Sequence, residues 1–234
     1  MNMLFLKKCG IAASIGLASL IPFSAKAFTL EYDFGQVFTG DAPVSGVQPW
    51  VKAIFQDVSP GLVSFTVSNP NLTGVENVDE LYVNLNPIFS PNDLTFTLQS
   101  SSPGFTVPTI SEGVNSFKAD GDGKYDVLFQ FSQGGTAFGV GDSMAYLISG
   151  GANIPNLNAM DFAYMSAPAG GNGPFYMAIH VQRIQLPSGQ SSGWVAPLNN
   201  QYVVVPEPSS ALLGLLAGGV ALGLRTVRQS RKSA

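Results

Sequence analysis

Short runs in which apolar and polar residues alternate recur along the middle of this chain, and they constrain its fold more than any other feature. In one such run, Leu94, Phe96 and Leu98 alternate with Thr95 and Thr97. Successive side chains of an extended strand point to opposite faces, so this pattern predicts strands with one buried and one solvated face. Such strands are typical of antiparallel sheets.

Turn sequences separate the alternating runs, as in the Ser-Pro-Gly tripeptides at 59–61 and 102–104. No stretch between them shows a sustained helical period. Ten strands are predicted, over Thr29–Phe34, Trp50–Asp57, Leu62–Asn69, Glu80–Leu85, Leu94–Gln99, Asp126–Ser132, Ser143–Ser149, Asp161–Ser166, Tyr176–Ile184 and Gln201–Val205. We therefore expect an all-β domain over residues 28–200, an antiparallel two-sheet β-sandwich of jelly-roll type.

The charge of this predicted domain restricts the classes of molecule that it can bind. Residues 28–205 contain 14 acidic and 4 basic side chains. An acidic surface repels phosphate backbones, so nucleic acid is excluded as a partner. The whole chain is 45% hydrophobic, which is too apolar for a disordered protein. The one cysteine, Cys9, precedes the domain, so the sequence excludes disulfides and zinc–thiolate sites within it.

The first 27 residues have the three parts of a secretory signal peptide. A pair of lysines provides the positive start, residues 10–23 are apolar, and Ala25-Lys26-Ala27 has the small-x-small pattern of a cleavage site. We expect export through the Sec translocon and cleavage after Ala27, with Ala25 and Ala27 as the recognised small residues. An uncleaved amphipathic helix is the alternative, which the shortness of the apolar run disfavours.

The other end of the chain has three elements in order. Pro206-Glu207-Pro208 comes first, and residues 211–224 then form an apolar stretch of 14 residues. This length is at the short limit for a helix that spans a bilayer. A basic cluster follows, and the positive-inside rule would keep it cytoplasmic while the domain faces outward. The cluster consists of Arg225, Arg228, Arg231 and Lys232.

These three elements resemble the PEP-CTERM sorting domain of exported envelope proteins in Gram-negative bacteria and cyanobacteria. The resemblance covers residues 201–234 and implies that an exosortase, an integral-membrane cysteine protease, recognises Pro206, Glu207 and Pro208 and cleaves the tail. It also implies transient anchoring in the inner membrane through a C-terminal hydrophobic helix. Release to the cell envelope, the cell surface or the matrix, and association with exopolysaccharide or biofilm, would follow. An unprocessed tail anchor is the alternative.

The predicted domain also resembles an ectodomain that recurs among PEP-CTERM proteins. This ectodomain has no assigned biochemical activity, so the resemblance implies fold and location only. It is carried by the segments 49–53, 81–85, 119–126, 166–175, 180–182 and 192–194.

Three aspartates on a glycine-rich turn are the best candidate for a metal site. Asp120, Asp122 and Asp126 could converge on Ca²⁺, which takes six to eight oxygen ligands. Lys118 and Phe129 stand where the first and last acidic ligands of an EF-hand loop would be, so a complete EF-hand is excluded. Two interpretations stay open: an irregular calcium site, or a hairpin turn in which aspartate and glycine provide only the backbone geometry.

Signatures of catalysis are incomplete. Residues 189–193 read Gly-x-Ser-x-Gly, but no helix is expected after them, and the one histidine, His180, precedes them. A lone histidine in a strand is more often a structural residue than a base or a ligand.

Paired acids could serve glycoside hydrolysis, but neither candidate pair has a flanking signature. Glu31 and Asp33 could share one face of a strand. The adjacent Asp79 and Glu80 would point to opposite faces if extended. Solvated surface acids are the simpler interpretation of both pairs.

The sequence therefore predicts a non-enzymatic exported envelope or matrix protein without a catalytic site. The alternative is a carbohydrate-binding module at the cell surface, stabilised by calcium, in which Trp50 and Trp194 would stack on sugars. Buried core aromatics are the commoner role of tryptophan in β-sandwiches.

Overall fold

The computed structural model describes residues 27–206 of the chain. Strands dominate, the helical elements of the described part are four short 3₁₀ turns, and none of its helices is long and apolar enough to cross a membrane. The strands are β1 Phe28–Gly40, β2 Val51–Ser59, β3 Leu62–Ser68, β4 Asn77–Val83, β5 Thr95–Ser101, β6 Thr109–Lys118, β7 Lys124–Gln130, β8 Ser143–Ser149, β9 Met177–Leu186, β10 Gly189–Pro197 and β11 Val203–Pro206. The 3₁₀ turns are η1 Pro91–Asp93, η2 Gly134–Thr136, η3 Ala159–Phe162 and η4 Leu198–Asn200.

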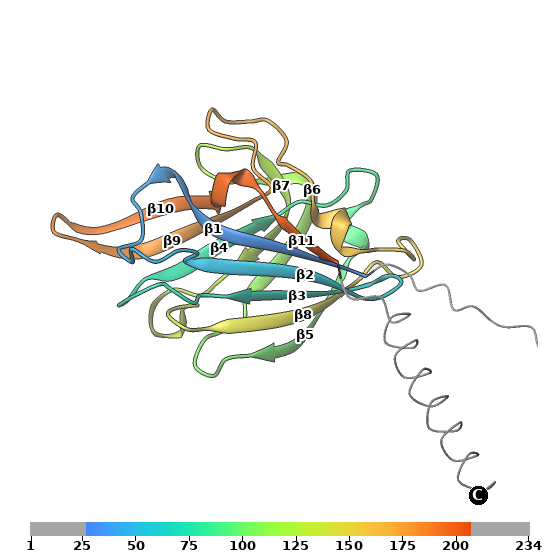
Figure 1. The fold of residues 1–234 in the computed structure, drawn as a ribbon, viewed down its shortest axis with the longest axis horizontal. Helices are drawn as coiled ribbons and strands as arrows, with labels where there is room; N and C mark the ends of the chain where they lie inside the picture. The colour runs from blue at the N-terminus through green and yellow to red at the C-terminus, as the bar shows by residue number, and fades with distance from the viewer. Residues whose placement is uncertain (1–26, 207–234) are drawn as a thin grey trace, which may run out of the picture.

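The strands form one continuous antiparallel sheet in the order β5-β8-β3-β2-β1-β10-β9-β4-β7-β6, with β11 also paired to β1 (Figure 1). The predicted all-β antiparallel class is confirmed. The two-sheet arrangement is not confirmed, because hydrogen bonding runs without a break from β5 to β6.

Strand β1 joins the two halves of the sheet. Its first part pairs with β2 and β11, and its last part pairs with β10. Register shifts interrupt the β10 pairing between Phe34 and Gln36 and between Val37 and Thr39. Such bulges bend a strand and increase its twist, so β1 can turn from one half of the sheet into the other.

The sheet curls so that strands from its two ends pack against each other. Phe129 on β7 lies 5.3 Å from Phe65 on β3, 5.5 Å from Phe96 on β5 and 5.9 Å from Tyr146 on β8, measured between ring centroids. Phe129 is 1% exposed. The inward faces of both halves therefore share one apolar core, which stabilises the curl through burial.

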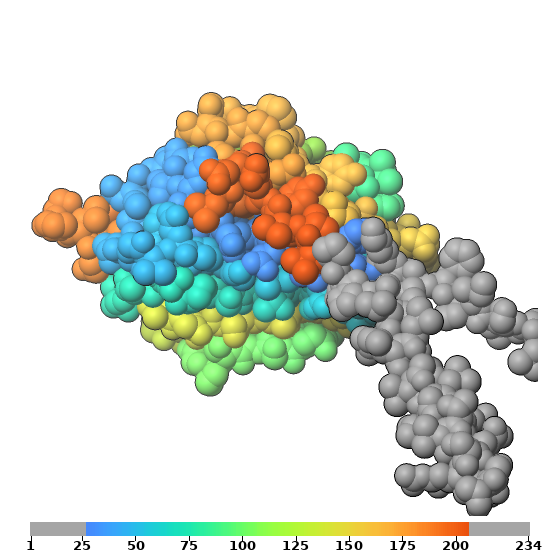
Figure 2. Space-filling model, in the orientation of Figure 1, coloured from blue at the N-terminus to red at the C-terminus, as the bar shows by residue number. Residues whose placement is uncertain are grey.

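The two ends of the described chain lie side by side. Phe28 at the start of β1 is directly opposite Pro206 at the end of β11. The hairpin of β9 and β10 projects at the far end of the molecule (Figures 1 and 2). The first and last described strands therefore begin and end at the same end of the sheet.

Nine of the ten predicted strands are present; Ser143–Ser149 has its predicted bounds and the other eight have shifted ends. The predicted strand Asp161–Ser166 is wrong, because a capping box between Asn158 and Asp161 starts the 3₁₀ turn η3 there instead. Two strands were missed, β6 and β10. The predicted domain boundary at residue 200 falls just before β11, which belongs to the sheet.

Candidate functional site

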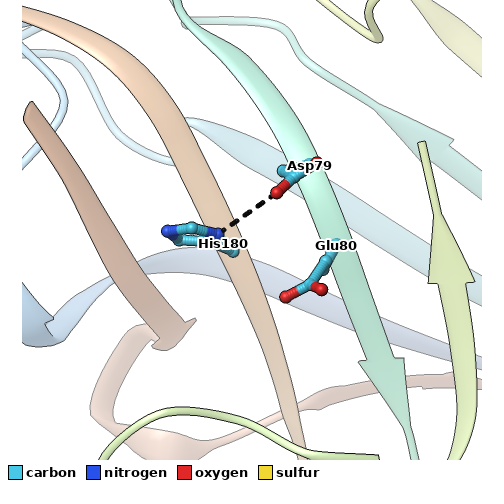
Figure 3. A group of neighbouring side chains, drawn as sticks. All are labelled: Asp79, Glu80 and His180. Carbon is cyan, nitrogen blue, oxygen red and sulfur yellow. Dashed lines mark ion pairs between the residues drawn. The ribbon is translucent and has the colours of Figure 1, made fainter. Parts of the chain in front are cut away.

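Two acids and the histidine meet on the face of the sheet opposite the main core. We call Asp79, Glu80 and His180 the outer cluster (Figure 3). His180 on β9 stands directly opposite Glu80 on β4, and on its other side directly opposite Trp194 on β10. Cross-strand neighbours on one face lie close enough for their side chains to interact.

A bulge in β4 brings Asp79 into this cluster. Val78 pairs with Val181 and Glu80 pairs with His180, so Asp79 is an extra residue without an opposite partner on β9. An inserted residue breaks the alternation of faces. The prediction that Asp79 and Glu80 point to opposite faces is therefore wrong, since both carboxylates approach His180 (Figure 3).

Hydrogen bonds hold the two carboxylates in place. Oδ2 of Asp79 accepts a 2.6 Å bond from the side-chain amide of Gln182 and lies 3.5 Å from Nδ1 of His180. Its Oδ1 accepts from the side-chain amide of Gln133. Neither glutamine carried a signal in the sequence, because they reach Asp79 from β9 and from the segment after β7.

Glu80 is held by a phenol on the same strand. The hydroxyl of Tyr82 donates a 2.9 Å hydrogen bond to Oε2 of Glu80. Burial and then the negative charge of Glu80 raise the pKa of Tyr82, so its hydroxyl stays protonated and able to donate.

Aromatic rings position the imidazole. The rings of His180 and Trp194 are stacked with centroids 4.4 Å apart and planes 10° apart. Tyr82 lies 5.6 Å and Phe38 lies 6.4 Å from the same indole. His180 is therefore fixed between an indole and two carboxylates, on a half-buried patch of the outer face.

The outer cluster offers ligands for a divalent ion. One atom from each of its residues lies within 4.8 Å of the others. Zinc bonds of about 2.0–2.2 Å in a tetrahedron place two ligand atoms about 3.4 Å apart, close to the 3.5 Å between His180 and Asp79. The same groups can equally donate hydrogen bonds to a polyhydroxylated ligand and accept hydrogen bonds from it.

The predicted calcium ligands are not gathered into such a group. Among residues 27–206, the acids and histidine with ligand atoms within 4.8 Å of one another are those of the outer cluster, and Asp120, Asp122 and Asp126 are not among them. Asp120 is exposed, whereas Asp122 is 1% and Asp126 is 8% exposed. The calcium site stays a prediction.

Asp122 and Asp126 each have protein partners. Oδ2 of Asp122 accepts from the hydroxyls of Tyr125 at 2.5 Å and Ser166 at 3.0 Å. The carboxylate of Asp126 accepts from the backbone amides of Leu85 at 3.0 Å and Asn115 at 2.8 Å. Asp122 therefore holds the segment after η3 against the sheet, and Asp126 holds the segment after β4 and part of β6.

The remaining acid pair lies on β1. Glu31 and Asp33 share a face, as predicted, and both contact the ammonium group of Lys52. Burial lowers the pKa of Lys52, but its hydrogen bonds to the two carboxylates outweigh this and raise it overall. The pair is therefore neutralised in part by a lysine.

The Gly-x-Ser-x-Gly segment lacks the geometry of a nucleophile. Its Ser191 lies in β10, donates to Asp41 at 2.5 Å and pairs with Ile184 rather than with His180. No α-helix follows the segment directly, since β10 continues to Pro197 and is followed by the three-residue 3₁₀ turn η4. This arrangement differs from the strand–turn–helix of a nucleophile elbow.

The two tryptophans have different environments. Trp50 is 5% exposed and donates a 2.9 Å hydrogen bond from Nε1 to the backbone oxygen of Ser45, so it is a core residue. Trp194 is half-buried on the outer face. Trp194 is thus the tryptophan available to a ligand.

Several predicted signals lie outside the described residues. They are Ala25, Glu207, Pro208, Arg225, Arg228, Arg231 and Lys232. Ala27 and Pro206 are the first and last residues described. Comparisons with protein-family models, with curated proteins and with solved structures found no match to this chain.

Proposed function

We propose that this chain is a non-enzymatic exported protein of the cell envelope or extracellular matrix. Its signal peptide directs it through the Sec translocon, and an exosortase then processes the segment that begins at Pro206. The mature protein associates with exopolysaccharide or biofilm. The sequence of the two ends supports this proposal, since a signal and a sorting motif bracket one acidic domain.

One structural observation carries the proposal. Strand β1 begins at Phe28, the residue after the predicted cleavage site, and β11 ends at Pro206, the first residue of the sorting motif. The sheet thus occupies the interval between the two predicted processing signals. Because Phe28 and Pro206 are paired, both signals connect to one end of the sheet.

For the fold, we propose a sandwich of jelly-roll type whose two layers are the halves of the curled sheet. The ring contacts of Phe129 with Phe65 and Phe96 support this, because they join β7 to strands at the other end of the strand order.

The sorting step is tested by replacing the acid of the motif. Glu207→Gln in the producing bacterium should leave a longer species in the membrane fraction, because the exosortase no longer recognises the motif. Asp93→Gln is a control at an acid of η1, outside the sorting motif, and this variant should be processed normally. Identical mass and fractionation of the wild type and Glu207→Gln would favour an unprocessed tail anchor.

A second candidate function is carbohydrate binding on the outer face. Trp194, His180 and Glu80 are successive cross-strand neighbours, and the row continues through Gln130 on β7 to Thr109 on β6. A row of an aromatic ring and hydrogen-bonding side chains across five strands matches the needs of an extended glycan. The observation that favours it is this unbroken row.

Binding of the full chain to purified exopolysaccharide tests this second candidate. Trp194→Ala should weaken retention at least about tenfold, the loss expected when a stacking contact of roughly 1.4 kcal/mol disappears. Tyr164→Ala, which removes an exposed aromatic ring elsewhere, is the matched control. Equal retention of both variants would reject a glycan site at Trp194.

A further inference from the structure

The amide at the predicted cleavage point is held by a carboxylate. The backbone nitrogen of Phe28 donates a 2.9 Å hydrogen bond to Oδ2 of Asp57 on β2. Oδ1 of Asp57 accepts a 2.6 Å bond from the backbone nitrogen of Ala159, the first residue of η3. One side chain thus ties the start of β1 to η3.

No cationic side chain neutralises Asp57 in the part of the chain that the structure describes. The ion pairs between residues 27 and 206 join Lys52 to Glu31 and Asp33, and His180 to Asp79. The partners of Asp57 are two neutral amides. A half-buried carboxylate gains more from a charged donor than from a neutral one.

Cleavage after Ala27 would convert the nitrogen of Phe28 from an amide into an α-ammonium group. We propose that Asp57 is the acceptor for this new N-terminus, so that signal removal creates an ion pair that the precursor lacks. The inference rests on the proposed export and adds a consequence of it: the processed chain is more stable than the precursor. The positive charge would appear 2.9 Å from a carboxylate oxygen already in place.

The surroundings leave space for this change. Ala27 lines a surface hollow of about 440 Å³ together with Asp57, Pro60, Asn156 and Asn158, so its removal opens no hole in the core. The side chain of Phe28 packs against the main core and keeps β1 in register after cleavage.

Within residues 27–206, titratable groups can approach the new amine from β2, β11 and η3, the elements next to Phe28. Asp57 is the acid that contacts it from β2, and β11, the other strand paired with Phe28, has no titratable side chain over Val203–Pro206. From η3, Asp161 is hydrogen-bonded to Asn158. Among the titratable groups of these three elements, Asp57 is thus the one within hydrogen-bond distance of the nitrogen of Phe28.

The test uses the chain from Phe28 to Ala234 in detergent micelles, released from a fusion partner so that Phe28 is the first residue. A second chain has four neutral residues before Phe28, which restore the amide and move the amine away. Asp57→Asn should raise the unfolding equilibrium constant about tenfold more in the first chain than in the second, since charge-assisted hydrogen bonds are about twice as strong as neutral ones. Asp93→Asn, at a half-buried acid that accepts a hydrogen bond from Asn153, should change both chains equally.

The pH dependence separates an ion pair from a purely structural contact. An α-amino group has a pKa of about 7.7–8.0 when unfolded, and a neighbouring carboxylate raises its pKa in the folded state. The extra stability should therefore be complete below about pH 7.5 and disappear as the pH rises through the folded pKa. Equal effects of Asp57→Asn in the two chains, or a difference that persists at pH 10, would overturn the inference. Because both chains are made without export, this outcome is independent of whether the signal is cleaved in the cell.

Discussion

Oδ2 of Asp122 accepts a 3.0 Å hydrogen bond from the hydroxyl of Ser166, which follows it by 44 residues. The backbones of Lys124 and Ala167 exchange two further hydrogen bonds of 2.8 and 2.9 Å. The aspartate turn is therefore joined to the glycine-rich segment after η3. Burial and then the charge of Asp122 raise the pKa of Tyr125, so that its phenol also donates to Asp122.

Asp122→Ala should destabilise the chain by about 2–4 kcal/mol, because two buried hydroxyls lose their acceptor. Asp120→Ala, two residues earlier and exposed, should change stability by less than about 0.5 kcal/mol. Urea unfolding followed by tryptophan fluorescence measures both. Equal effects of the two substitutions would contradict the structural role of Asp122.

Gly173→Ala should be strongly destabilising, by about 2–4 kcal/mol. A Cβ atom at Gly173 would lie 1.4 Å from Oδ1 of Asp122, so either the segment or the aspartate must move. Gly171→Ala is the matched control, since an added Cβ there meets nothing within 4 Å. Thermal unfolding measures the melting temperatures of the two variants. Equal melting temperatures for Gly173→Ala and Gly171→Ala would show that the segment does not pack on Asp122.

Calcium chelation should leave the melting temperature unchanged. Both oxygens of Asp126 and one oxygen of Asp122 already accept hydrogen bonds from the protein, so an ion would have to displace these donors. Differential scanning calorimetry with chelator and with added Ca²⁺ makes the comparison. A rise in melting temperature with Ca²⁺ that Asp126→Asn abolishes would restore the calcium interpretation.

Phe129→Ala should cost about 3–5 kcal/mol, the usual range for removing a buried aromatic ring. The ring joins the two ends of the sheet through Phe65, Phe96 and Tyr146, so its loss leaves a cavity at the centre of the curl. Ile88→Ala, at a side chain 77% exposed, should change stability by less than about 0.5 kcal/mol. A cost below about 1 kcal/mol for Phe129→Ala in urea unfolding would contradict the shared core.

The alternation of apolar residues predicted most strands because burial of one face of a strand places apolar residues at every second position of its sequence. Ser143–Ser149 was predicted with its observed bounds, and every second residue in it is buried. The missed strand β10 begins with glycines and serines, and β6 has no fully buried side chain. Neither strand therefore shows the alternation of apolar residues in its sequence. Their backbones are ordered by pairing with β9 and β7 rather than by their own composition.

Local sequence patterns could not predict the outer cluster, for a different reason. Asp79 joins Glu80 and His180 through one inserted residue in β4, and a bulge depends on the register of two strands that are far apart in the chain. The aspartates on the glycine-rich turn were predicted as a turn or a metal site. Their partners Ser166, in the segment after η3, and Asn115, in β6, belong to other parts of the chain, which a local motif does not identify.

The most direct test of the account is the intact mass of the protein recovered from the envelope and matrix fractions of the producing bacterium. Export followed by sorting predicts a chain that begins at Phe28 and lacks both the apolar stretch 211–224 and the basic cluster after it. A full-length mass from Met1 to Ala234, found in the cytoplasm, would contradict it.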